Sequence, residues 1–523
     1  MANEIKAQSV KKNLIFQIAY QFVILVVPLI IAPYLTRVLG GTALGVYSYT
    51  YSVANYFVLF AMLGIIRHGQ RIVAARRDDK LALRKAFWSL YTVHAAFSSV
   101  AIIAFVTFAA VFGGEYKNIY FIQTLFVASA LFDVTWLFYG LENFKSVVIR
   151  NFILKIAECV LIFCLVKTSD DLWIYALIMT SSLCLGQLVM VPQAIGYIRP
   201  VKFGWADVKE HFKPLFVLFI AVVAATLYTV FDKTLLGIMS TKENVAYYEY
   251  SDKIIGVPKT IISVICTVMF PRACASIAKG DIGRAQKYVD YSLQFTCLLG
   301  IGSIFGLLGV ANLFAVLYYG EGFAICGYVI MALSPNIIII EIGNIVRTLY
   351  IVPNKMDKHL SISYIINAVL NIALSVALIP VLGIYGAVVG TLAAEVCGLV
   401  YQMILCRKFL PVKKVLITVI PYVLFGAAMF GVIFLIRQYF NATWWHLIFQ
   451  IAAGGTLYVI LSAIYLFKFS SVKENLTGLL HRTFRKKSKV AAGTEQNTTE
   501  EEVASSDDKE HNQDEKSNNV RNV

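Results

Sequence analysis

Apolar stretches of about 20 residues recur along the whole chain, separated by short polar gaps. Hydrophobic residues make up 59% of the 523 residues, and the mean hydropathy is +0.71. A helix needs roughly 20 apolar residues to cross about 30 Å of hydrocarbon. The pattern therefore predicts an all-α polytopic membrane protein with about fourteen transmembrane helices, near residues 14–35, 43–66, 86–112, 119–140, 147–166, 172–195, 214–239, 246–270, 288–314, 323–351, 360–380, 384–406, 415–437 and 446–468.

Basic residues are concentrated in every second gap. The gap between the second and third stretches holds seven of them, from Arg67 to Lys85, whereas the sparse gaps hold only Arg37, Lys117, Lys167, Lys242 and Arg437. Cytoplasmic loops carry an excess of Lys and Arg. We therefore expect both termini to be cytoplasmic. The net charge of +15 belongs to loops beside a membrane and does not indicate nucleic-acid binding.

An internal repeat occurs at an offset of 201 residues. The segment 45–49 matches the segment 246–250, so that Tyr47 corresponds to Tyr248, and Arg71 corresponds to Arg272. Six helices separate the two units, which gives both halves the same orientation, and parallel repeats place a substrate path between two bundles. We expect a six-helix bundle at 1–196, a cytoplasmic linker at 197–213, a second six-helix bundle at 214–406, two further helices at 407–469 and a cytoplasmic tail at 470–523.

The tail and the cysteines add little chemistry. The tail begins with a basic segment suited to anionic headgroups, and its acidic end, from residue 495, is expected to be disordered. The nine cysteines lie almost wholly within the apolar stretches, with no CxxC pair and no histidine at ligand spacing. We expect no metal site and no cofactor.

Two dipeptides within the stretches carry charge. An ionisable group in the hydrocarbon costs roughly 2.5–3.5 kcal/mol on insertion scales. Asp232-Lys233 and Asp252-Lys253 lie on consecutive helices, each about 10 Å below the outer surface by helix rise. They are compatible with two roles, a mutual ion pair that joins the helices or contacts to a phosphate-bearing or sugar substrate.

Other polar residues in the stretches extend this set. The candidates for substrate binding are Arg37, Tyr47, Tyr51, Asn55, Asp232, Lys233, Asp252, Lys253, Asn344 and Arg347, and those for ion coupling are Asp133, Glu158, Glu341 and Glu395. For any one of them outside the two dipeptides, an interhelical hydrogen bond is the simpler explanation. Together they predict a polar, aromatic interior suited to hydroxyl-rich cargo.

Catalytic motifs are absent from the sequence. There is no GxxxxGK[ST], GxSxG or HExxH pattern. The predicted outer loops are all short, which argues against a membrane glycosyltransferase or polymerase that must hold an acceptor. We therefore expect a protein that is not an enzyme.

Several segments resemble a known family. They are 33–40 (PYLTRVLG), 45–49 (GVYSY), 132–142 (FDVTWLFYGLE), 231–237 (FDKTLLG), 268–272 (VMFPR) and 379–391. Over about residues 10–410 the chain is similar to the bacterial polysaccharide flippases of the multidrug/oligosaccharidyl-lipid/polysaccharide (MOP) exporter superfamily. The resemblance implies a V-shaped pair of six-helix bundles around a central cavity. It also implies movement of undecaprenyl-diphosphate-linked oligosaccharide from the inner to the outer leaflet by alternating access.

The resemblance leaves alternatives open. Peptidoglycan-precursor relatives line their cavity with arginines on the first, second and eighth helices, whereas here Lys253 is the nearest equivalent. This difference favours a repeat-unit flippase for capsule, exopolysaccharide or wall polymer over a lipid II flippase. A multidrug or cation antiporter of the same superfamily is a further alternative. The implied partners are a polyprenyl-diphosphate-linked glycan, membrane lipid, and polysaccharide polymerases and glycosyltransferases in the bacterial cytoplasmic membrane.

Overall fold

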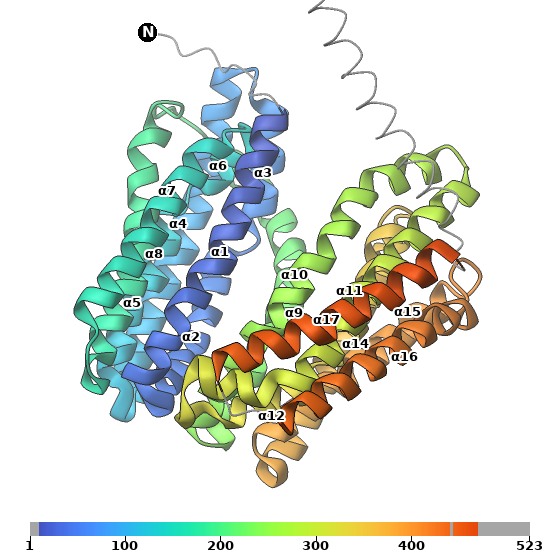
Figure 1. The fold of residues 1–523 in the computed structure, drawn as a ribbon. Helices are drawn as coiled ribbons and strands as arrows, with labels where there is room; N and C mark the ends of the chain where they lie inside the picture. The colour runs from blue at the N-terminus through green and yellow to red at the C-terminus, as the bar shows by residue number, and fades with distance from the viewer. Residues whose placement is uncertain (1–9, 440–442, 469–523) are drawn as a thin grey trace, which may run out of the picture. The chain divides into compact units, whose positions relative to one another are not determined.

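The computed structural model describes residues 10–439 and 443–468, without the side chains of 10–22, 221, 224, 225 and 227–229. All regular structure in this part is helical (Figure 1). The α-helices are α1 (Val10–Val38), α2 (Gly40–Met62), α3 (Ile65–Arg76), α4 (Lys80–Phe112), α5 (Lys117–Leu131), α6 (Thr135–Gly140), α7 (Phe144–Leu165), α8 (Leu172–Ile195), α9 (Trp205–Met239), α10 (Lys242–Ala278), α11 (Ile282–Tyr319), α12 (Ile325–Leu333), α13 (Asn336–Val346), α14 (Asp357–Leu382), α15 (Ile384–Leu405), α16 (Val412–Arg437) and α17 (Trp444–Lys468). Short turns are η1 (Gly114–Tyr116), η2 (Ser169–Asp171), η3 (Glu321–Phe323) and the π-helical turn η4 (Arg347–Ile351).

Each of the fourteen predicted stretches is occupied by one or more helices. The fourth stretch is shared by α5 and α6, and the tenth by α12, α13 and η4, with a bend of 43° before Asn336. Among the described residues, ten helices are long and apolar enough to cross a membrane, or eleven if the bent pair counts as one span. The predicted class of polytopic all-α membrane protein is confirmed.

Side-chain caps mark several helix starts in the gaps. The carboxylate of Asp79 accepts from the backbone N–H groups of Leu81 and Ala82 at the start of α4. Thr241 caps α10, and Asp281 caps α11 in the same way. The first N–H groups of a helix have no partner within the helix, so these short oxygen-bearing side chains stabilise its first turn.

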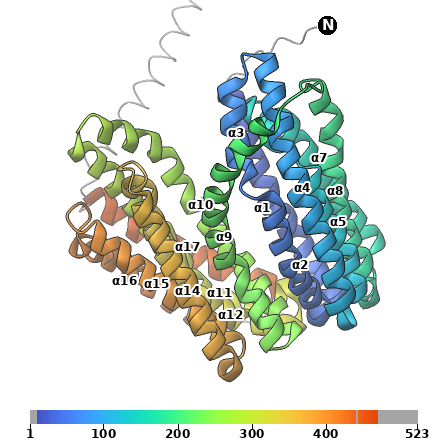
Figure 2. The same cartoon turned by 180° about the vertical axis from the view of Figure 1, so that it is seen from behind.

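The helices pack in two sets (Figures 1 and 2). In the first half, α1 packs on α7 and α5 packs on α8; in the second, α14 packs on α15 and α11 packs on α16. By contacts, the described residues through Thr456 form one compact unit, and those from Leu457 belong to a second. The predicted division into bundles at 1–196 and 214–406, with the linker and two further helices, stays a prediction. The predicted tail lies outside the described residues.

Helices α2 and α10 approach each other closely at their first turns. The Thr42 hydroxyl donates to the Glu243 carboxylate at 2.7 Å, and the two residues are 201 positions apart, the offset of the predicted repeat. A Cβ atom on Gly45 would lie 1.7 Å from the Lys242 carbonyl oxygen. Only glycine therefore allows the two backbones to meet at this depth.

A second contact joins the end of α1 to the end of α11. The Arg37 guanidinium donates to the carbonyl oxygens of Leu317 at 2.7 Å and Tyr318 at 2.8 Å. The Thr36 hydroxyl donates to the Tyr319 carbonyl at 2.7 Å. The last carbonyls of a helix have no partner within it, so Arg37 completes the end of α11 and ties α1 to it.

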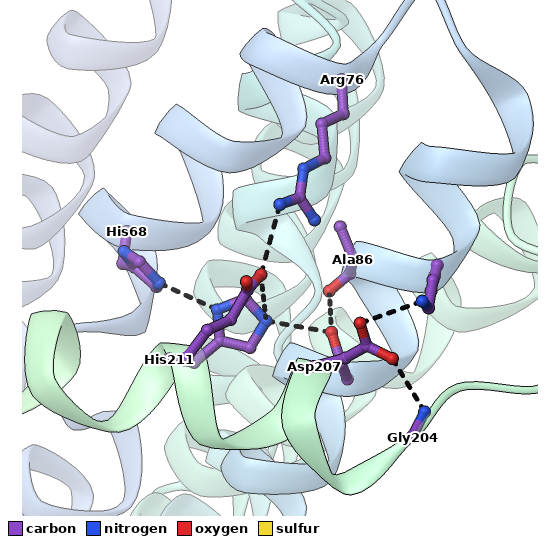
Figure 3. A network of polar contacts seen from close by, with 9 residues as sticks. His68, Arg76, Ala86, Gly204, Asp207 and His211 are labelled. Atoms are coloured by element: carbon purple, nitrogen blue, oxygen red, sulfur yellow. Dashed lines mark hydrogen bonds and ion pairs between the residues drawn. The ribbon is translucent and has the colours of Figure 1, made fainter.

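A polar network fastens the start of α9 to α3 and α4 (Figure 3). The ring of His211 contacts His68 Nε2 at 3.2 Å and the Ser89 hydroxyl at 2.9 Å. Burial lowers the pKa of His211, which lies before the apolar stretch at 214–239. The backbone N–H of Gly204 donates to Asp207 at 2.8 Å and holds the pKa of that carboxyl group below its ordinary value. The network anchors the segment between the two halves of the chain.

Candidate functional site

A cavity of 270 Å³ lies where helices from both halves of the chain meet. Its walls come from α1, α2, α7, α8, α9 and α10. Five charged side chains line it: Lys155, Glu158, Lys233, Glu249 and Lys253. Three ammonium groups against two carboxylates leave a formal charge of +1 (3 − 2) in an otherwise apolar and hydroxyl-bearing surface.

The charges are arranged in pairs. The Lys155 ammonium donates to Glu158 at 2.6 Å within α7. The Glu249 carboxylate lies between two lysines, bonded to Lys233 on α9 and 3.3 Å from Lys253 one turn along α10. The Glu249 side chain is 17% exposed and that of Lys253 is 35% exposed. The Glu249 carboxylate therefore fills a position between two ammonium groups that another anion could also occupy.

Tyrosines form the remaining polar wall. The rings of Tyr47 and Tyr51 stack with centroids 5.8 Å apart, and Tyr47 meets the ring of Tyr175 at 4.7 Å. The Lys253 ammonium lies 4.2 Å from the centroid of the Tyr250 ring, a favourable cation–π contact. A tyrosine offers a rigid apolar face together with a hydroxyl group. Such a wall is suited to contact with sugar rings.

Asp232 and Lys233, neighbours on α9, face different surroundings. Successive residues of an α-helix differ by about 100° around its axis. Lys233 faces the cavity, whereas the buried Asp232 accepts hydrogen bonds from the hydroxyls of Thr391 at 2.7 Å, Tyr248 at 3.0 Å and Ser375 at 3.3 Å. The interpretation that Asp232-Lys233 and Asp252-Lys253 pair with one another is therefore wrong. The hairpin is joined by Lys233 and Glu249 instead.

The second dipeptide is divided as well. Asp252 pairs with Lys259 at 3.3 Å and does not line the cavity, whereas Lys253 does. The sequence reasoning missed Glu249, although this ionisable residue lies within the predicted stretch 246–270. At the offset of 201, Glu249 corresponds to Ser48 on α2, and both residues line the cavity.

The remaining predicted site residues lie apart from this cavity. Asn55 and Arg37 are not among its lining residues. Asp133 accepts from the backbone N–H of Thr135 at 2.8 Å and from its hydroxyl at 2.5 Å. The last four belong to the C-terminal half: Asn344 donates to Glu341 at 3.2 Å, Arg347 donates to the Ile340 carbonyl at 3.4 Å, and Glu395 accepts from Asn367 at 3.0 Å.

A larger apolar groove of 810 Å³ lies beside the cavity. Its lining includes Leu29 and Ile30 of α1, Ile254 and Ile261 of α10, and further side chains of α11, α16 and the first half of α17. Helices α1 and α10 contribute residues to both spaces. The charged cavity and the apolar groove therefore lie on two faces of the same pair of helices.

The cavity lining combines charged and hydroxyl-bearing side chains. In this part of the chain, no group of three or more His, Cys, Asp or Glu side chains could hold a metal ion. The paired charges and tyrosines instead offer exchangeable contacts to an anion with attached hydroxyl groups.

Comparison with known proteins gives the family. The model of the family described as "Polysaccharide biosynthesis protein" matches residues 10–275, which include the whole lining of the cavity. The chain belongs to this family. A protein of Escherichia coli (strain K12) described as an O-antigen transporter is 23% identical over 398 residues, covering 74% of this chain and 94% of its own length. A protein of Haloferax volcanii described as a low-salt glycan biosynthesis flippase is 23% identical over 194 residues, or 37% of this chain and 41% of its own.

Solved structures share the fold of this family member. The lipid II flippase MurJ in an inward closed conformation superposes with a TM-score of 0.64 at 18% identity, covering 87% of this chain and 99% of its own. An inward-facing MATE multidrug resistance transporter of the MOP superfamily gives a TM-score of 0.54 at 12% identity, covering 73% and 97%. These likenesses establish the transporter fold that the resemblance implied.

Proposed function

We propose that this protein is a flippase that moves polyprenyl-diphosphate-linked oligosaccharide from the inner to the outer leaflet by alternating access. It is a transporter rather than an enzyme. The observation that carries the proposal is the cavity that Lys155, Lys233 and Lys253 line from three different helices. A diphosphate cannot enter hydrocarbon unaided, because an unpaired charge there is strongly unfavourable. A cavity with ammonium groups and tyrosines supplies both charge and hydrogen bonds.

The pairing of the lysines gives a binding step. Without substrate, Glu249 lies between Lys233 and Lys253 and offsets one of their two positive charges. A diphosphate carries more negative charge than one carboxylate, so it displaces Glu249 from the two ammonium groups. The tyrosine wall then contacts the first sugars. Because binding replaces one set of ion pairs with another, the lysines are never left without a partner.

The apolar groove fits the lipid part of the substrate. Its lining is almost wholly hydrocarbon, and it adjoins the cavity across α1 and α10. Burial of apolar surface contributes about 25 cal/mol per Å². A polyprenyl chain in the groove would therefore be stabilised while its diphosphate lies in the cavity.

The cellular setting follows from the same proposal. The alternation of basic gaps supports cytoplasmic termini in a bacterial cytoplasmic membrane. The names of the relatives support a glycan as cargo. Glycosyltransferases must supply the lipid-linked unit, and a polymerase or ligase must consume it at the outer face.

The test is export of glycan by lysine variants. Lys233→Gln and Lys253→Gln should each lower surface polysaccharide about tenfold or more, since losing one charged contact is equivalent to at least about 1.4 kcal/mol. Lipid-linked repeat units should accumulate in the inner leaflet. The matched control is Lys287→Gln, at an exposed position of α11. Normal export in the double variant Lys233→Gln/Lys253→Gln at normal abundance would contradict the proposal.

A further inference from the structure

The C-terminal helices enclose another cavity, of 330 Å³, with walls from α10, α13, η4, α14 and α15. Its polar lining consists of Lys259, Thr260, Ser263, Glu341, Arg347, Tyr364, Asn367 and Glu395. Thr260 is exposed, so the space reaches the surface. None of these residues lines the 270 Å³ cavity that holds Lys155, Lys233 and Lys253.

Two carboxyl groups in this cavity are deeply buried. Glu395 is 4% exposed and Glu341 is 3% exposed. Each has a neutral amide as its neighbour: Asn367 donates to Glu395 at 3.0 Å, and Asn344 donates to Glu341 at 3.2 Å. In the described part of the chain, no ion pair joins either carboxyl group to Lys259 or Arg347. A buried carboxylate in this position is unfavourable unless it binds a positive ion.

Asn367 provides an independent observation. It is 2% exposed, and its Oδ1 atom has no hydrogen-bond partner among the described residues. An amide presents two donors on one side and an acceptor on the other. In the present orientation the Asn367 nitrogen donates to the charged Glu395 carboxylate. If the amide rotates by half a turn, its oxygen accepts from the protonated Glu395 acid instead. Asn367 can therefore bond Glu395 in either protonation state.

We propose that Glu395 is the proton-exchanging group of the transporter, with the 330 Å³ cavity as its route to water. This inference rests on the proposed transport function. Water in the cavity gives a proton to the Glu395 carboxylate, and the acid later returns it to water; no other bond forms or breaks. A metal cation needs several ligands, and among the described residues no group of three or more His, Cys, Asp or Glu side chains could hold one. A proton neutralises the carboxylate without needing further ligands.

The groups around Glu395 connect it with the rest of the bundle. Lys259 faces it from α10, Glu341 from α13, Arg347 from η4 and Tyr364 from α14. α12, which also packs on α15, carries no Lys, Arg, Asp, Glu or His. On the α9 side, Asp232 bonds Thr391, one turn from Glu395 on α15.

Movement of one element would couple the proton to transport. The helix pair α12–α13 is bent by 43° and ends in the π-helical turn η4. Such turns are frequent at functional sites. This element carries Glu341 and Arg347, so it can bring the guanidinium to Glu395 when the carboxylate is charged and withdraw it when the acid is neutral. Protonation thereby favours one arrangement of the C-terminal helices over another.

The experiment is an infrared titration of the full-length protein in liposomes. A C=O band of a protonated carboxyl group should disappear as the pH is raised, and it should be missing from Glu395→Gln. Glu395→Asp should retain the band at a shifted position, because the acid remains. Asn367→Ser should shift its titration. The exposed Glu321 provides the control, since Glu321→Gln should leave the titration unchanged.

Other outcomes would overturn the assignment. A titrating band that persists unchanged in Glu395→Gln and Glu395→Asp would place the proton elsewhere. A titration that shifts when Na⁺ replaces choline would assign a metal cation instead. Surface glycan is measured in the same variants, and Glu395→Gln should lower it at normal abundance. Because the infrared signal needs no glycan, a normal titration in a protein that exports none would reject the proposed function and leave the proton site standing.

Discussion

The two faces of α9 stabilise charged groups in different ways. On one face, Lys233 lies in the cavity and pairs with Glu249, which also pairs with Lys253. On the other face, Asp232 is 4% exposed and bonded by three hydroxyl groups of α10, α14 and α15. The first face offers charges that an anion can exchange. The second holds a carboxylate in a fixed set of neutral donors.

This difference separates binding from packing. An ion pair in a partly open cavity can be replaced by a stronger pair, because water and substrate reach it. A carboxylate enclosed by hydroxyls is reached only if the helices around it move. Substitutions on the two faces should therefore have different effects on glycan export and on membrane abundance.

The largest effect is expected from Glu249→Lys. Three ammonium groups would then lie together, and each unpaired charge is unfavourable by roughly 2.5–3.5 kcal/mol on insertion scales. We expect loss of export together with a fall in membrane abundance, measured by immunoblot and surface glycan. Adding Lys233→Glu restores one ion pair, so abundance should recover while export stays low. Full recovery of export by this charge swap would show that the pair only joins the helices.

A smaller effect is expected from Asp232→Asn. The amide keeps one acceptor oxygen and loses part of a hydrogen-bond set in which each bond contributes about 1 kcal/mol. Because these bonds join helices and do not line the cavity, abundance and export should fall together, by about the same factor. Ser375→Ala removes the longest of the three bonds, at 3.3 Å, and serves as the graded control. A several-fold loss of export at unchanged abundance in Asp232→Asn would contradict the packing role.

The sequence predicted the fold more completely than the site. Length, hydropathy and the Lys/Arg alternation located all fourteen stretches, because a membrane requires long apolar helices. The cavity was predicted only in part: Tyr47, Tyr51, Lys233, Lys253 and Glu158 line it. Asp232 was assigned to the substrate site only from its depth below the outer membrane surface, and depth does not determine the direction in which a side chain points. Glu249 could have been found as an ionisable residue within the predicted stretch 246–270.

The smallest effect is expected from deletion of 491–523, which lies outside the described residues. This acidic segment has few large apolar side chains with which to pack. Surface glycan and membrane insertion should stay near normal. Deletion from residue 470 should be worse, because attraction of about 1 kcal/mol per basic residue to anionic lipid is lost. Loss of export from the shorter deletion would make the tail a docking segment.

Direct binding of undecaprenyl diphosphate to the purified protein in nanodiscs tests the central claim, with undecaprenol as the lipid that lacks phosphate. The account predicts that the wild-type protein binds the diphosphate lipid at least about tenfold more tightly than undecaprenol, a difference of about 1.4 kcal/mol. The double variant Lys233→Gln/Lys253→Gln should lose this preference and keep its affinity for undecaprenol. An unchanged preference for the diphosphate in the folded double variant would contradict the assignment of the cavity as the diphosphate site.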